Sequence, residues 1–240
     1  MFGILAQSEH NLSTIGVEIT WARCRDGVEL HDYGSVAVPK FADEPRFSLT
    51  GALSGRWIRN RSTEVQLYNL RLADLKNPLF EKFINCKSPQ DFVEFVRDYG
   101  IPGPSSYDGL DASETELSTL ESVRDGIRRV MDKSVKGSPY ECSSAYNSFV
   151  MSLRGTALKP LLAIWRNTSA PSLCFQPVNL YGYMAMEVAM AISSAAALRT
   201  CLHCSSAFLA GPLTSKRSNA YYCSNRCRVA AQRAKVPLFP

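Results

Sequence analysis

Two pairs of cysteines near the C-terminal end constrain this chain of 240 residues more than any other feature. Cys201 and Cys204 form the first pair, and after a loop of eighteen residues Cys223 and Cys227 form the second. Two close pairs separated by a loop supply the four thiolates that a tetrahedral Zn²⁺ takes in structural sites. We therefore expect one structural Zn²⁺, with no open position for a catalytic water. His203 lies inside the first pair, but four thiolates already complete the ligand set.

The residues around the second pair predict a short helix. Ser224 can act as its N-cap, and the helix is expected to run to Lys235 because a proline two residues later stops it. Phe208 and Tyr222 are expected to form a small core beside the metal. A first pair on a hairpin and a second pair at a helix N-terminus is the treble-clef arrangement. We therefore expect residues 199–240 to form a small treble-clef-like zinc finger.

Basic side chains are concentrated in the same segment. Seven of the 27 basic residues fall in 199–240, which contains no Asp or Glu, so residues 1–198 hold 20 basic and 22 acidic residues. This asymmetry points to an anionic partner for the tail, most often nucleic acid. Four thiolates on one Zn²⁺ carry a net charge of −2, which lowers the charge of the metal-bound tail from +7 to about +5.

On the predicted helix, the basic residues occupy two faces. Arg226 and Arg233 share one face, and Arg228 and Lys235 share another with Gln232 between them. Arg forks match phosphate oxygens, and Arg or Gln232 could read base edges if the helix enters the major groove of DNA. The apolar side is expected to pack, and it consists of Val229, Ala230, Ala231 and Ala234. The candidate nucleic-acid contacts are Lys216, Arg217, Arg226, Arg228, Gln232, Arg233 and Lys235.

This tail resembles a C-terminal four-cysteine finger found in a group of bacterial proteins. The matching pattern is Cys201-x2-Cys204-x3-Phe208, and then Tyr222-Cys223-Ser224-x2-Cys227-Arg228-x4-Arg233. It is similar to the CGNR-type zinc fingers of stress-linked transcriptional regulators, which follow a mixed α/β domain ending in a helix. Arg228-Val229-Ala230 stands where those fingers have Gly-Asn-Arg. The resemblance implies four zinc ligands, a basic helix and a DNA-binding regulatory function.

The remainder of the chain predicts an α+β fold with a β-rich part over 1–75 and a mainly helical part over 76–198. Residues 14–21 alternate between polar and apolar as a half-buried strand does. Asp26-Gly27 predicts a hairpin turn that returns residues 28–31 antiparallel to that strand. Further strands are expected over 33–38, 49–58 and 65–72.

Helix signals recur through the middle of the chain. Ser88 and Asp91, with a proline between them, predict a capped helix start, and Gly100 predicts the end of that helix. Ser113 and Glu116 predict a second capping box. The expected helices cover residues 79–85, 88–99, 113–136, 140–153 and 178–199. The short apolar runs 161–165 and 172–176 are open between strand and irregular core.

Cysteine usage and the first residues suggest a cytoplasmic protein. The other four cysteines are scattered singly, without a disulfide framework: Cys24, Cys86, Cys142 and Cys174. Residues 1–8 lack the basic and apolar regions of a signal peptide. The most apolar stretch, 180–198, contains Glu187 and is expected to be a buried helix instead of a membrane span.

The sequence favours a binding protein over an enzyme, since no Walker loop, GxSxG, HExxH or dinucleotide glycine motif is present. The favoured hypothesis is a nucleic-acid-binding transcriptional regulator, with DNA preferred to RNA, whose first 198 residues sense a signal or form a homodimer. The main alternative is a protein-interaction module with a partner protein, such as a toxin–antitoxin or phage-defence component, in which zinc is purely structural. A metal-dependent nuclease is third, with Mg²⁺ held by Glu29, Asp32, Asp43 and Glu44.

Overall fold

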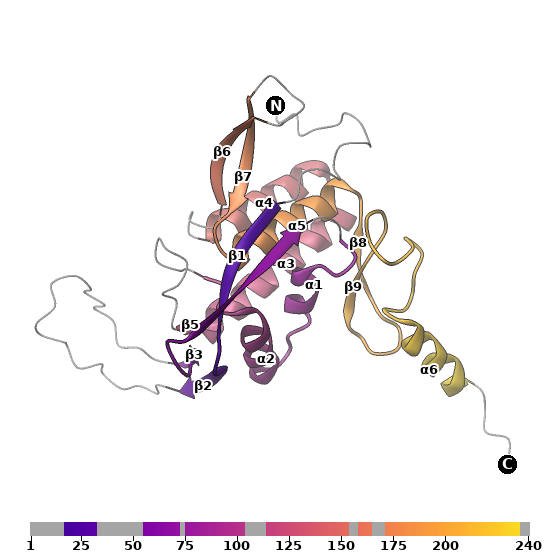
Figure 1. Ribbon diagram of the computed structural model, residues 1–240. Coiled ribbons are helices and arrows are strands. Elements are labelled where there is room, and N and C mark those ends of the chain that lie inside the picture. Colours follow the sequence, from indigo (N-terminus) through magenta and orange to yellow (C-terminus); the bar gives the residue numbers. More distant parts are fainter. Residues whose placement is uncertain are drawn as a thin grey trace, which may run out of the picture.

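The computed structural model describes residues 17–32, 55–72, 75–103, 114–153, 158–164 and 171–235. Strands occupy the N-terminal part, helices dominate the middle, and the four cysteines lie together near the C-terminal end. This is the α+β arrangement that the sequence predicts. Figure 1 shows the last helix extending away from the rest of the molecule.

An antiparallel ribbon forms the N-terminal part (Figure 1). β1 (Val17–Cys24) pairs with β4 (Val65–Leu72), and β2 (Val28–Asp32) pairs with β3 (Arg56–Asn60). A third short strand, β5 (Glu114–Glu116), pairs with the free side of β3. The strand predicted over 65–72 is confirmed as β4. The strand predicted over 49–58 overlaps β3 only at residues 56–58, and residues 49–54 lie outside the described part. The strand predicted over 33–38 lies outside the described residues.

The hairpin predicted at Asp26-Gly27 is wrong, because β1 and β2 do not pair with each other. β1 and β2 follow one another along the ribbon. Two backbone bonds lie where one strand pair ends and the other begins: the Arg25 N–H donates to the Glu64 carbonyl, and the Arg61 N–H donates to the Gly27 carbonyl. Gly27 has a φ of 80°, which bends the chain without reversing it. An Asp-Gly pair supplies the left-handed residue that a hairpin turn requires, but a bend or a bulge requires it too. The pair therefore indicates where a strand is interrupted and does not determine which strand the next one pairs with.

Five helices form the middle of the chain: α1 (Leu79–Ile84), α2 (Pro89–Tyr99), α3 (Leu117–Lys136), α4 (Pro139–Ser152) and α5 (Leu180–Ser193). The predicted cap of α2 is confirmed. Ser88 Oγ accepts from the Asp91 N–H at 3.3 Å, and the Asp91 carboxylate accepts from the Ser88 N–H at 2.8 Å. Gly100 ends this helix with a φ of 83°.

The capping box predicted at Ser113 and Glu116 is wrong. Residues 114–116 form β5, and α3 begins only after Glu116, whose backbone is extended and whose side chain caps nothing. Pairing with β3 places Thr115 opposite Ile58 in the interior, and this long-range contact overrides the local cap signal. Ser113 itself lies outside the described residues.

The last helix of the middle part is shorter than predicted. α5 ends at Ser193 and not at residue 199, and Ala195 then takes a φ of 56°. β8 (Ala197–Thr200) follows and pairs with β9 (Ala207–Ala210). Alanine-rich residues favour a helix, but the ladder to β9 outweighs that preference here. The cysteines therefore follow a strand, and the domain boundary predicted at residue 198 falls within β8.

The two apolar runs that the sequence left open are strands. β6 (Leu158–Ile164) pairs antiparallel with β7 (Pro171–Pro177), and Figure 1 shows this hairpin projecting beyond the helices. None of the helices in the described ranges combines the length and the apolar character that a membrane crossing requires. Of the scattered cysteines, Cys24 and Cys86 are buried and Cys142 is half-buried. The side chain of Cys174 lies outside the described part.

A buried carboxylate fixes α1 in the core. Glu187 of α5 is only 3% exposed, and its two oxygens accept from the Leu79 and Phe80 N–H groups at 2.8 Å each. These are N–H groups of the first turn of α1, which have no partner within the helix. Burial raises the pKa of Glu187 to about 8, although the two N–H groups and the charge of Lys82 oppose the rise. This contact matters for function because α1 also carries the C-terminal finger.

Candidate metal centre and basic helix

The first cysteine pair lies on the turn between β8 and β9. The Cys201 N–H donates to the Ser206 carbonyl at 2.9 Å, and the Ser205 N–H donates to the Cys201 carbonyl at 3.0 Å. Ser205 takes a φ of 57°, so the turn is tight enough to bring both sulfurs to one side.

The second pair lies at the start of α6 (Asn225–Lys235). The predicted N-cap is confirmed, since Ser224 Oγ accepts from the Cys227 N–H at 3.2 Å. A backbone bond of 3.1 Å from the Leu202 N–H to the Tyr221 carbonyl joins the two pairs. One pair on a hairpin and one at a helix N-terminus is the treble-clef-like arrangement expected from the sequence.

The four sulfurs form one cluster. The Sγ atoms of Cys201, Cys204, Cys223 and Cys227 all lie within 4.8 Å of one another. The Cys204–Cys223 separation is 3.6 Å and the Cys223–Cys227 separation is 3.5 Å. A disulfide requires about 2 Å, whereas sulfurs on the corners of a tetrahedron with metal–sulfur bonds of about 2.3 Å lie about 3.8 Å apart. The cluster therefore has the dimensions of a metal site.

The electrostatics of the cluster favour a cation. Burial works against ionisation of Cys201, but the backbone N–H groups of Cys204, Cys223 and His203 outweigh it and lower its pKa to about 6. The Ser206 side chain and N–H lower the pKa of Cys204. Burial, followed by the sulfurs of Cys227 and Cys204, raises the pKa of Cys223 to about 12. Cys201 and Cys204 therefore ionise more readily, whereas the crowded Cys223 is held neutral, and a bound cation would allow it to ionise as well.

The finger has a small core of its own. Cys201, Phe208 and Ala210 are buried together, and Tyr222 packs against them, as the sequence predicts for Phe208 and Tyr222. The predicted packing of the apolar side of α6 is wrong. Val229 is 39% exposed, Ala234 is also exposed, and the neighbouring alanines are half-buried. The Leu202–Tyr221 backbone bond and the cap at Ser224 fix the start of α6, and the remaining turns project from the finger (Figure 1).

Side chains of α1 and of its C-cap residue Asn85 fasten the finger to the rest of the molecule. The Asn85 amide donates to the Ala207 carbonyl and accepts from the Ala207 N–H, both at 2.8 Å. Glu81 Oε2 accepts from the Leu209 N–H at 2.8 Å. Ala207 and Leu209 are alternate residues of β9, so α1 occupies the strand edge that faces away from β8. A further backbone bond joins the Leu75 N–H to Leu213 at 3.0 Å.

Among the predicted nucleic-acid contacts with described side chains, all are exposed except Lys216. Arg226, Arg228, Gln232 and Arg233 are exposed on α6, and Lys235 ends that helix with a side chain outside the described part. Arg217 is exposed in the preceding loop. Lys216 is half-buried beside α1, where its charge and the Leu209 N–H oppose the rise that burial causes in the pKa of Glu81. The structure therefore gathers the helix residues and sets Lys216 apart.

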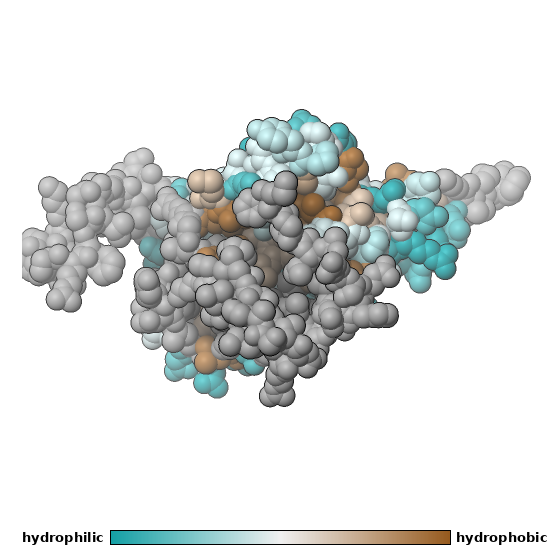
Figure 2. Space-filling model, turned by 90° about the horizontal axis from the view of Figure 1, so that it is seen from above, coloured by the Kyte–Doolittle hydropathy of each residue, from teal (hydrophilic) through white to brown (hydrophobic). Residues whose placement is uncertain are grey.

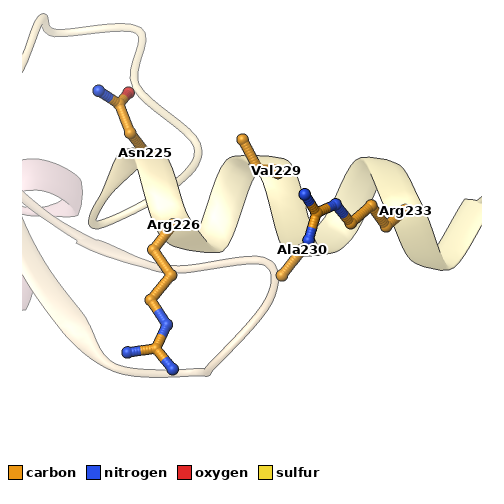
Figure 3. Close-up of a pocket in the computed structure, with 5 residues that line it drawn as sticks. All are labelled: Asn225, Arg226, Val229, Ala230 and Arg233. Carbon is orange, nitrogen blue, oxygen red and sulfur yellow. The ribbon is translucent and has the colours of Figure 1, made fainter.

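Charged side chains of α6 are available for an external ligand. Within the described ranges, no carboxylate forms an ion pair with Arg226, Arg228 or Arg233. Figure 2 shows hydrophilic residues gathered at the end of the molecule where α6 lies. Figure 3 shows Asn225 and Val229 pointing to one side of α6, Arg226 and Ala230 to the other, and Arg233 along the helix between them.

The predicted acidic Mg²⁺ site is not assembled by the described residues. Glu29 accepts from Arg59 at 2.6 Å and lies 3.9 Å from Arg61, so its charge is used in ion pairs. Asp43 and Glu44 lie outside the described ranges. Within those ranges, the four cysteines form the one group of metal-ligand type that meets at a point, and the exposed His203 is not part of it.

Sequence reasoning missed the residues that connect the finger to the core. Glu81, Asn85 and Glu187 carry no local pattern, because their partners are more than one hundred residues away in the sequence. The signal that could have flagged Glu187 is its position as a single acid in an otherwise apolar helix. No family model matches this chain, and no curated protein matches it either.

Proposed function

We propose that the C-terminal finger holds one structural Zn²⁺ and binds nucleic acid through α6, DNA in preference to RNA, in a transcriptional regulator of the kind that the CGNR-type resemblance implies. Four thiolates at tetrahedral separations support zinc, because soft sulfur ligands in this geometry suit Zn²⁺ and a closed set leaves no catalytic position. The zinc ion stabilises the finger and holds α6 at a fixed angle.

The observation that carries the DNA-binding proposal is the free charge of α6. Three exposed arginines lie on a helix that projects from the molecule, with no acid after Glu187 in the sequence. Guanidinium groups that stabilised the fold would be paired with carboxylates of the same chain. A nucleic acid supplies phosphates along the whole length of such a helix. Each phosphate that an arginine neutralises releases counterions, and this release favours binding.

A binding titration of the full chain tests this proposal. With four to six phosphate contacts, log affinity for random duplex DNA should fall with log salt at a slope of about −4 to −5. Replacing Arg226, Arg228 and Arg233 by Ala should reduce that slope by about 3. The matched control replaces three exposed basic residues outside the finger by Ala, and it should leave the slope unchanged: Arg56, Lys87 and Arg129. Absence of salt-dependent binding to any duplex or single strand would refute the proposal.

Metal analysis tests the zinc assignment separately. The purified protein should contain about one Zn²⁺ per chain, and Cys204→Ser should lose it while Cys142→Ser retains it. Removing the ion with a strong chelator should abolish amide protection in residues 199–235 and leave α3 protected, because the finger core is too small to persist alone. A chain that keeps its finger protected without any metal would contradict a structural role for zinc.

A second candidate function is supported by two exposed apolar residues beside the metal site. Leu202 is 71% exposed and Tyr221 is 61% exposed, and the backbone bond between these two residues holds them next to each other. Such a pair suits a partner protein better than a phosphate backbone. If the titration finds no nucleic acid, the protein-interaction module becomes the favoured function. Leu202→Ser with Tyr221→Ser would then be the variant to test for lost association.

A further inference from the structure

The exposed surface of α6 is divided into three rows. The sulfur of Cys227 belongs to the four-cysteine cluster, so Cys227 marks the inner side of the helix. At 100° per residue, Asn225, Val229 and Gln232 lie along the opposite, outermost line. Arg226 and Arg233 lie on one flank of that line, and Arg228 lies on the other. The outer line therefore contains no charge, and basic residues border it on both sides.

This arrangement matches the major groove of B-form DNA in size and charge. An α-helix with its side chains is about 10–12 Å across, and the major groove is about 12 Å wide. A helix lying in the groove faces base edges along its outer line and a phosphate backbone on each flank. The neutral row would then meet the bases, and the two arginine flanks would meet the two strands.

Building on the proposed function, we propose that α6 reads duplex DNA through Asn225, Val229 and Gln232, with a preference for A·T base pairs. Asn and Gln amides form paired hydrogen bonds with N6 and N7 of adenine, and an aliphatic side chain such as Val contacts the methyl group of thymine. Asn225 and Gln232 are exposed, and neither amide has a side-chain hydrogen bond among the described contacts of the finger.

The spacing of the row sets the length of the recognised site. Asn225 and Gln232 are seven residues apart, which is about 10.5 Å along the helix axis. Base pairs are stacked about 3.4 Å apart along the DNA axis, but a helix that lies in the groove follows a longer, inclined path, so the two amides reach positions about two steps apart. Val229 lies between them and faces the intervening pair. Each finger therefore reads about three base pairs, with an A·T pair at each end.

Selection from duplexes with randomised central positions, using the full metal-bound chain, tests this inference. The recovered sequences should contain A·T pairs about two steps apart. Asn225→Ala with Gln232→Ala should weaken binding to the selected duplex about ten-fold or more and leave both the salt slope and the affinity for the unselected pool unchanged. Asn219→Ala, which removes an exposed amide from the loop before α6, is the matched control and should change nothing.

The outcomes separate the two proposals. Steep salt-dependent binding without any recovered preference, or a preference that survives the double substitution, would overturn base reading by this row and leave DNA binding in place. Absence of duplex binding would overturn both. Zinc content and circular dichroism of each variant show whether it has folded. Because alanine favours helix at both positions, a folded variant that loses the preference supports the inference.

Discussion

The buried carboxyl of Glu187 should make the protein less stable as the pH rises from 5.5 to 7.5. Its pKa is raised from 4.5 to about 8 in the folded protein, so the folded state binds a proton that the unfolded chain has released. The free energy of unfolding therefore falls across this window, and the contribution is fully present only below the unfolded pKa. With one pKa unit worth about 1.4 kcal/mol, the loss between pH 5.5 and 7.5 is about 2.5 kcal/mol.

Urea denaturation of the wild type and of Glu187→Gln at several pH values measures this pH dependence of the free energy of unfolding. The neutral amide cannot titrate, so the variant should lose the decline of about 2.5 kcal/mol. The comparison cancels protonation of the cysteines, which affects both proteins equally. Glu94→Gln, an exposed position in α2, should keep the wild-type slope. Equal slopes for wild type and Glu187→Gln would show that the two N–H donors keep Glu187 ionised and that the argument from burial is wrong.

Three further substitutions test contacts that position the finger and the core. Asn85→Ala removes two hydrogen bonds to Ala207 and should lower the free energy of unfolding in urea by about 1–3 kcal/mol; an unchanged midpoint would show that water replaces both bonds. Gly100→Ala would place a Cβ against the Ala22 carbonyl oxygen of β1 at a φ of 83°, so thermal unfolding should show a loss above about 2 kcal/mol. A variant as stable as wild type would contradict this contact. Ser224→Ala removes the N-cap of α6 and should lower the local stability of the helix start by about 1 kcal/mol, which hydrogen exchange measures as a faster rate at the Cys227 amide. An unchanged exchange rate would mean that metal ligation alone fixes the helix start.

Features set by nearby residues could be predicted from the sequence. The cysteine pairs, the cap at Ser224 and the cap at Ser88 each depend on spacings of a few residues, and each is observed. The same local rules fail where distant chain segments compete. Pairing with β3 takes Glu116 out of the predicted helix, and pairing with β9 takes Ala197 out of another. The periodicity of a segment indicates whether it tends to form a helix or a strand, but its tertiary contacts determine which of the two it forms.

The candidate site shows the same division between local and distant information. The ligand set is written in consecutive residues, whereas the attachment of the finger depends on Glu81 and Asn85, which lie more than 120 positions earlier in the chain. Exposure of Val229 was also unpredictable, because an amphipathic pattern cannot say whether a neighbouring surface exists. Val229 lies on the outer side of α6 and remains 39% exposed.

Closure of the β9 edge by α1 has a consequence for solubility. A two-stranded sheet normally leaves backbone donors and acceptors open on its outer side, and these can recruit a strand from another molecule. Asn85 and Glu81 occupy those groups at Ala207 and Leu209, much as a third strand would. The β9 edge of the finger is therefore closed to pairing with a strand from another molecule, which removes one route to edge-to-edge aggregation.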